Sequence, residues 1–98
     1  MVSLSNVYKK SPDFVFRKVA DEYILVPIRH NIGDLNHIYN LNEVAARIWS
    51  LIDGKRKVKE IKDKIIEEFE TTPQEAEKDL IELIHKLKKI KGIKIKKP

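Results

Sequence analysis

The sequence of 98 residues contains no cysteine, so disulfide bonds, thiolate metal sites and cysteine nucleophiles are excluded. Its three glycines stand far apart, and none belongs to a glycine-rich phosphate-binding loop. No apolar run approaches the roughly 18 residues that a membrane helix needs. The N-terminus also lacks the basic and apolar segments of a secretory signal. We therefore expect a cytoplasmic protein with no membrane partner.

The side chains that usually carry catalysis or bind metals are few and scattered. None of the three histidines, His30, His37 and His85, has a second histidine at the i, i+4 spacing of a helical zinc site. No serine lies in the sequence context of a nucleophile elbow. The sequence therefore predicts no cofactor, no metal site and no enzymatic activity.

Charge is abundant and unevenly placed. Charged residues make up 36% of the chain and the net charge is +5. Residues 86–98 hold seven lysines and no acid, so the rest of the chain is slightly acidic. The 42% apolar content suffices for one hydrophobic core. We expect one domain over residues 1–98, with residues 91–98 either frayed or joined to it.

The first half of the sequence predicts three strands. Residues 14–19 and 23–28 are rich in β-branched and aromatic side chains, and the short break between them predicts an antiparallel hairpin. Pro27 has no N–H to donate, so it places the end of the second strand at an edge or a bulge. After a turn-forming segment, residues 37–41 complete a small meander.

The second half predicts three helices. Asn42 is the expected N-cap of the first, which ends before Gly54. The second spans about residues 58–69. Its start is poorly capped, because the Lys57 side chain offers no acceptor to the free N–H groups of the first turn.

The third helix has the clearest boundaries. It begins at the capping residue Thr72, runs to about residue 90 and is ended by Gly92. After it, residues 93–95 either add a short strand or stay frayed. Its apolar side chains cover about half of the helix circumference, more than the stripe of roughly 100° that an ordinary surface helix needs. The excess either meets the sheet or lines a groove along one flank, formed by Glu77, Ile81, Ile84 and Lys88.

A family resemblance begins near the third strand. The residues that carry it are Leu41-Asn42-Glu43, Ala45, Ile48-Trp49, Leu51, Asp53-Gly54, Val58 and Glu60-Ile61. This pattern resembles the central motif of PqqD-like proteins, the PQQ-synthesis protein D family, which are also peptide recognition elements of ribosomal-peptide biosynthesis. The similarity covers Tyr39 to about Ile90. Lys57 and the lysine-rich tail depart from the family pattern.

The resemblance implies an α+β, winged-helix-like fold, with a three-stranded antiparallel sheet followed by three helices. It also implies a non-catalytic function: binding the leader segment of a precursor peptide for a modifying enzyme, often a radical-SAM enzyme. The leader adds as a strand beside the third strand and faces the third helix. Mapped here, the peptide-binding residues are His37, Ile38, Tyr39, Asn40, Leu41, Glu77, Ile81, Ile84 and Lys88.

Two other functions stay open at this point. The first is a winged helix-turn-helix that binds DNA, suggested by the high pI and disfavoured by the carboxylates that begin the third helix. The second is a structural subunit that docks on an enzyme without reading a peptide. An open third strand also allows two copies to pair, so the prediction is a monomer or an edge-strand dimer.

Overall fold

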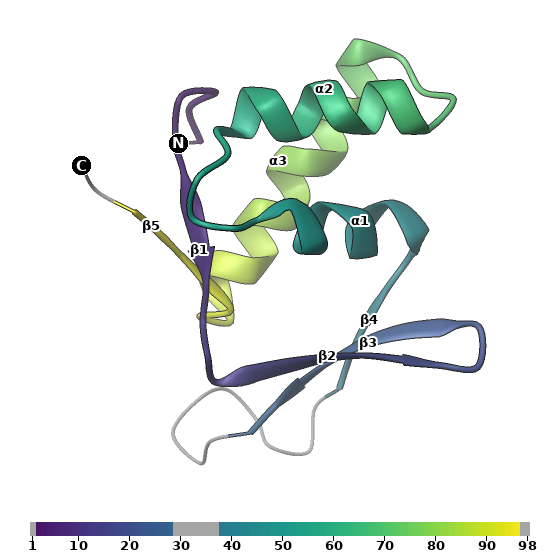
Figure 1. Cartoon of the computed structure of the whole chain (residues 1–98), viewed down its shortest axis with the longest axis vertical. Helices are drawn as coiled ribbons and strands as arrows, with labels where there is room; N and C mark the ends of the chain where they lie inside the picture. Colours follow the sequence, from purple (N-terminus) through teal and green to yellow (C-terminus); the bar gives the residue numbers. More distant parts are fainter. Residues whose placement is uncertain (1, 29–37, 97–98) are drawn as a thin grey trace.

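The computed structural model describes residues 2–28 and 38–96. A three-stranded antiparallel sheet is followed by three helices, as the sequence predicts. Figure 1 shows the sheet at one end of the molecule, with the helices stacked on one side of it. None of the described helices combines the length and apolar character that crossing a membrane requires.

The main sheet has the order β2-β3-β4. Strands β2 (Phe14–Val19) and β3 (Glu22–Pro27) form the expected hairpin, closed where Val19 pairs with Glu22. Strand β4 (Tyr39–Leu41) pairs with the other side of β3. The observed β4 is shorter than the predicted strand, because Ile38 lies outside it and residue 37 lies outside the described residues.

A second sheet joins the two ends of the described chain. Strand β1 (Tyr8–Lys10) pairs antiparallel with β5 (Ile93–Ile95), and Figure 1 shows this ribbon beside the C-terminal end of the third helix. The sequence left residues 93–95 open between a strand and a frayed end, and they form a strand. β1 was not predicted, because three residues give too short an alternation to detect.

The three helices begin where the sequence places them. Helix α1 (Glu43–Leu51) is capped by Asn42, whose Oδ1 accepts from the Ala45 N–H at 2.8 Å. Helix α3 (Pro73–Lys89) is capped by Thr72, whose Oγ1 accepts from the Glu75 N–H at 3.1 Å. Helix α3 ends before Gly92, as the sequence predicts, and the residue with left-handed φ past its end is Lys91, with φ 65°.

Helix α2 (Val58–Glu68) obtains its N-terminal acceptors from a distant segment. The N–H groups of Val58 and Lys59 donate to the backbone carbonyls of Asn6 and Leu4, each at 2.9 Å. These bonds satisfy donors that the Lys57 side chain cannot. The poor cap expected from the sequence is therefore repaired by the residues that precede β1.

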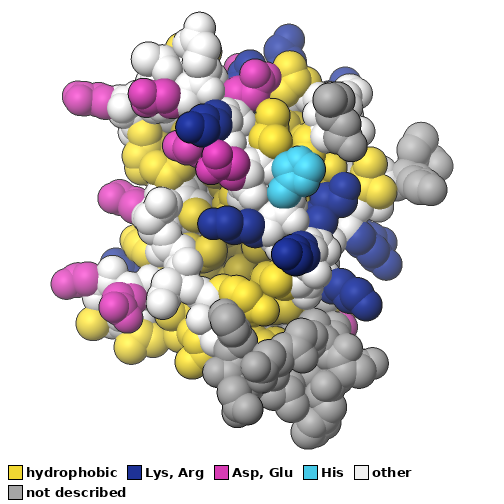
Figure 2. Space-filling view, turned by 180° about the vertical axis from the view of Figure 1, so that it is seen from behind, with side chains coloured by type: hydrophobic (Ala, Val, Ile, Leu, Met, Phe, Trp, Pro, Cys, Tyr) yellow, Lys and Arg dark blue, Asp and Glu magenta, His cyan; other side chains and the backbone are white. Residues whose placement is uncertain are grey.

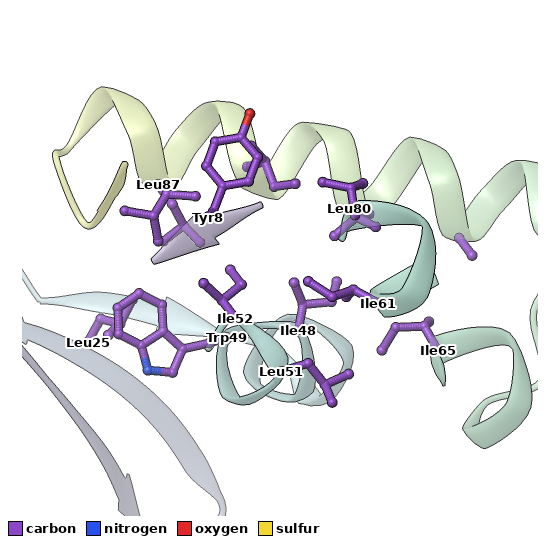
Figure 3. Close-up of a cluster of buried hydrophobic side chains, with 14 of the residues drawn as sticks. Tyr8, Leu25, Ile48, Trp49, Leu51, Ile52, Ile61, Ile65, Leu80 and Leu87 are labelled. Atoms are coloured by element: carbon purple, nitrogen blue, oxygen red, sulfur yellow. The ribbon is translucent and has the colours of Figure 1, made fainter. Parts of the chain in front are cut away.

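The core is formed by side chains from all three helices and both sheets. In Figure 3, Ile48 of α1 and Ile52, the residue that follows this helix, lie between the sheet side and the α3 residues Leu80 and Leu87. All four are at most 2% exposed. Because α1 is covered by α3 along this face, truncating any of these side chains leaves a cavity.

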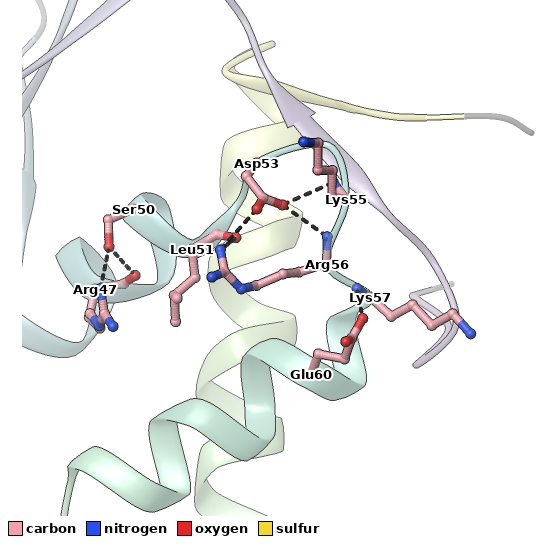
Figure 4. Close-up of polar contacts among 8 residues, drawn as sticks. All are labelled: Arg47, Ser50, Leu51, Asp53, Lys55, Arg56, Lys57 and Glu60. Carbon is pink, nitrogen blue, oxygen red and sulfur yellow. Dashed lines mark hydrogen bonds and ion pairs between the residues drawn. The ribbon is translucent and has the colours of Figure 1, made fainter.

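The turn between α1 and α2 is fixed by one carboxylate (Figure 4). Asp53 Oδ1 accepts from the N–H groups of Lys55 and Arg56, both at 2.9 Å, and Oδ2 accepts from Arg56 Nη1. These bonds, led by the Arg56 N–H, lower the pKa of Asp53 below its ordinary value. Gly54 follows with φ +77°, a conformation that glycine adopts without strain.

Candidate functional site

Strand β4 forms one wall of the candidate site. It is the edge of its sheet: β3 lies on one side, and no other described strand pairs with it on the other. Tyr39 and Leu41 are half-buried, whereas Asn40 between them is exposed. This alternation places Tyr39 and Leu41 on one face, where both pack against the core.

The start of α1 continues this wall. Asn42 turns the chain from β4 directly into the helix, so Val44 and Ala45 lie next to Leu41 in the lining of a single cleft. Ile48, one turn further, contributes to its floor and is 1% exposed. The cleft is therefore apolar at its base because of residues that also build the core.

Helix α3 forms the opposite wall. The residues that face β4 define what we call the open flank: Asp79, Glu82, Leu83, Lys86, Lys89 and Ile90. Leu83 and Ile90 are half-buried against the core and the other four are exposed. The wall thus has an apolar stripe with a charged rim.

Together these walls enclose a cleft of about 440 Å³. Figure 2, which views the molecule from behind, shows a hollow with an apolar floor and charged side chains around it. Clefts that combine an apolar base with a few polar groups are typical binding sites. An edge strand beside the cleft adds backbone groups that a second extended chain can pair with.

The structure brings together the strand half of the predicted site. Tyr39, Asn40 and Leu41 all line the cleft. Ile38 precedes β4, is 52% exposed and does not line the cleft. Of the neighbours Ile38 and Tyr39, it is therefore Tyr39 that faces the cleft. Residue His37 lies outside the described residues.

The helical half of the predicted site lies on the other side of α3. We call Glu77, Ile81, Ile84 and Lys88 the closed flank. Glu77 forms an ion pair with Lys62 of α2 at 3.8 Å, and Lys88 Nζ lies 5.9 Å from the ring centre of Tyr8 in β1. Ile84 is fully buried. None of the four lines the cleft.

The reason for this difference is geometric. The apolar arc of α3 has two ends, with Ile81 at one and Leu83 and Ile90 at the other. The sequence pattern shows both ends but not which element covers each. The apolar residues of α3 that line the cleft, Leu83 and Ile90, lie at the opposite end of the arc from the flank that the sequence offered for a groove. The ribbon of β1 and β5, which the sequence did not reveal, lies on the side of the closed flank.

A second hollow of about 330 Å³ lies among the β2-β3 hairpin, α1 and the C-terminal end of α2. Its lining includes Phe16, Tyr23 and Phe69, and the charged residues Arg47 and Glu68. Arg47 donates to both carboxylate oxygens of Glu68, at 2.7 and 2.8 Å. These bonds raise the pKa of Arg47 and lower the pKa of Glu68. The charges of Arg47 and Glu68 are therefore already matched within the chain, and Glu43 adds a further charge to the lining.

A metal-binding group or a side chain with a shifted pKa would add chemistry to the described part of the cleft. Among residues 2–28 and 38–96, no group of three histidine or acidic side chains is placed to hold a metal ion. A lysine with a lowered pKa, Lys10, owes the shift to burial, which the nearby Asp53 carboxylate opposes. It lies over the Trp49 ring at 5.4 Å and not in the cleft.

Two solved structures share this fold. One, described as TbiB1 in complex with the TbiA(beta) leader peptide, has a TM-score of 0.71 and 26% identity. The other, lasso peptide synthetase B1 complexed with the leader peptide, has a TM-score of 0.69 and 20% identity. Each alignment covers 88% of this chain and 94% of the other. At 20% identity, the second shows the fold alone.

Sequence comparison gives the family. No curated protein matches the chain significantly. The family model for coenzyme PQQ synthesis protein D (PqqD) matches residues 22–91, well over half of the chain. This match runs from the start of β3 past the end of α3 and so includes every element that lines the cleft. The chain belongs to the PqqD family.

Proposed function

We propose that the cleft between β4 and α3 binds the leader segment of a ribosomally made precursor peptide and presents it to a modifying enzyme. The observation that carries this proposal is that β4, the last described strand of its sheet, lies beside an apolar cleft. Two similar structures whose descriptions name a bound leader peptide support it. Residues 1–98 would act as one such binding unit.

The physical basis is strand addition. A peptide that pairs with β4 gains main-chain hydrogen bonds that are independent of its sequence, and alternate side chains enter the cleft and provide selectivity. The strand residues Ile38, Tyr39, Asn40 and Leu41 remain the proposed pairing edge, together with His37. On the helix, the open flank replaces the closed flank as the proposed contact surface.

The chemistry would be carried out by the partner enzyme, which the family resemblance suggests is often a radical-SAM enzyme. We propose a non-catalytic, cofactor-free module, because the described residues of the cleft offer apolar contact and surface charge and form no metal-binding group. We also propose that this module acts in the cytoplasm. The DNA-binding alternative lacks support from the similar structures. The exposed acids Glu75 and Asp79 early in α3 would also repel phosphates.

The test is a titration of the 15N-labelled full chain with the synthetic leader of a short precursor encoded next to this gene. We expect backbone amide shifts at residues 38–41 and along the open flank, with small shifts at Ile81 and Ile84. A scrambled peptide of equal composition is the control, because it keeps charge and hydrophobicity while removing the order of side chains.

The outcomes separate the competing functions. Shifts confined to the closed flank would contradict the proposed cleft. Shifts of residues 38–41 that depend on protein concentration, and not on peptide, would indicate an edge-strand dimer. Binding to the modifying enzyme with no response to the leader would indicate a docking subunit.

A further inference from the structure

The charges along the open flank are separated by sign. Asp79 and Glu82 lie toward the middle of α3, and Lys86 and Lys89 lie in its last turns. All four are exposed and line the cleft. In Figure 2, acidic side chains gather above the hollow and basic side chains lie mostly to its right.

These four charges have no ion-pair partner within the described part of the chain. The ion pairs found there join Arg47 to Glu68, Arg56 to Asp53 and Lys62 to Glu77. Glu82 and Lys86 are four residues apart, a spacing at which opposite charges stabilise an exposed helix only weakly. The cleft charges are therefore available to a ligand.

Helix stability explains only half of this arrangement. Lysines in the last turn of α3 suit the negative end of the helix dipole. The dipole effect is confined to the first and last turns, however, and Asp79 and Glu82 lie in the second and third turns. Their acidity, on the flank that faces the cleft, calls for another reason.

We propose that the cleft selects an extended peptide that carries one acidic and one basic residue, with an apolar residue between them. The acidic residue would meet Lys86 and Lys89, the basic residue would meet Asp79 and Glu82, and the apolar residue would contact Leu83. This inference rests on the proposed function, since it assumes that the occupant of the cleft is a peptide strand.

The spacing follows from the two geometries. The midpoints of the acidic and basic pairs are seven residues apart on the helix, or about 10 Å at 1.5 Å per residue. A strand advances about 3.3 Å per residue, and every second side chain faces the same way. The even separations nearest this distance are two and four positions. Only a separation of four leaves a residue between the two charges that faces the same way and can contact Leu83, so the charges should be four positions apart.

The experiment is a selection of binders from a random 12-residue peptide library displayed on mRNA, with the full chain immobilised. We expect enriched peptides to carry opposite charges four positions apart, with an apolar residue midway, at least about threefold more often than unselected peptides. In the variant with Lys86→Glu and Lys89→Glu, the preferred acid should be replaced by a second basic residue. A matched control, Lys59→Glu with Lys78→Glu, changes the same charge outside the cleft and should leave the preference unchanged.

The outcomes distinguish this inference from the proposed function. Enriched peptides with no charge spacing, or with the same spacing in the Lys86 and Lys89 variant, overturn the inference and leave peptide binding intact. A folded protein that enriches no peptide overturns both. For one enriched peptide, replacing its acidic residue by glutamine should raise the Kd about threefold in low salt and less in high salt, because exposed charge pairs are screened.

Discussion

The two flanks of α3 differ in what covers them, although both carry apolar and charged side chains. The closed flank meets α2 through the pair of Glu77 and Lys62, and it meets β1 through Lys88 and Tyr8. The open flank faces β4 across the cleft. One helix thus packs against the rest of the fold on one side and lines the cleft on the other.

The exposure of an apolar side chain therefore depends more on which elements pack beside it than on its position along its own helix. Ile84 and Leu83 are adjacent in sequence and similar in size, yet Ile84 is fully buried and Leu83 is half-buried at the cleft. A sheet edge that stops short of a helix leaves room for another strand. This is the geometry that strand addition requires.

The largest expected effect comes from truncating the buried neighbour. Ile84→Ala should lower the free energy of unfolding by about 2–5 kcal/mol, because it leaves a cavity in a packed core. Leu83→Ala should cost about 1 kcal/mol, because its side chain is already partly in water. Urea denaturation of both variants measures the difference. Equal losses would mean that the two flanks are equally packed.

For leader binding, in contrast to folding stability, a change at Leu83 should have a larger effect than a change at Ile84. Leu83→Glu places a charge in the proposed peptide contact and should weaken leader binding at least about tenfold, since desolvated apolar contacts dominate such interfaces. Isothermal titration calorimetry measures the Kd, and the thermal midpoint checks folding. Val19→Glu, at a residue 56% exposed on β2, is the matched control. An equal loss in that control would remove the assignment to the cleft.

The main elements of the fold could be predicted from local sequence. The hairpin of β2 and β3 and the caps Asn42 and Thr72 depend on residues close together in the chain, so propensity and spacing suffice. The ribbon of β1 and β5 joins residues more than 80 positions apart, and the N-terminus of α2 is completed by carbonyls of residues 4 and 6. Such long-range pairs leave almost no local signal.

The candidate site was predictable to the same extent. The strand half followed from the family resemblance, and Tyr39, Asn40 and Leu41 do line the cleft. Predicting the helical half required knowing which end of the apolar arc of α3 faces β4. Helix periodicity shows the arc but does not show which element lies beside each end. The acids and lysines of the open flank were visible in the sequence, but only the fold shows that they border one cleft.

A smaller loss of folding stability should follow from a change in the turn between α1 and α2, which positions α2 beside the closed flank. Asp53→Ala removes two backbone hydrogen bonds and should cost about 1 kcal/mol at pH 7. Because folding lowers the pKa of Asp53, its contribution is present above its ordinary pKa of 3.8 and is lost as the pH falls through the lower, folded value.

Urea denaturation between pH 7 and pH 2 checks this sign. The gap between the native sequence and Asp53→Ala should stay constant down to about pH 4 and narrow below it. A gap that widens in acid would contradict the role of the ionised carboxylate. Leader binding at pH 7 should change little, because Asp53 lies outside the cleft.

The smallest expected effect is on folding stability, and it distinguishes whether an ion pair or apolar packing holds α2 against the closed flank. Lys62 and Glu77 meet at 3.8 Å, and their side chains are 18% and 42% exposed. A pair this open to water is worth about 0.5 kcal/mol or less, so a double-mutant cycle of Lys62→Ala and Glu77→Ala should give a coupling of that size that fades in salt. A coupling several times larger would make the ion pair a cause of closure. A coupling of about 0.5 kcal/mol or less would mean that the packing of the buried Ile84 side chain closes this flank. The two flanks of α3 would then differ by packing alone.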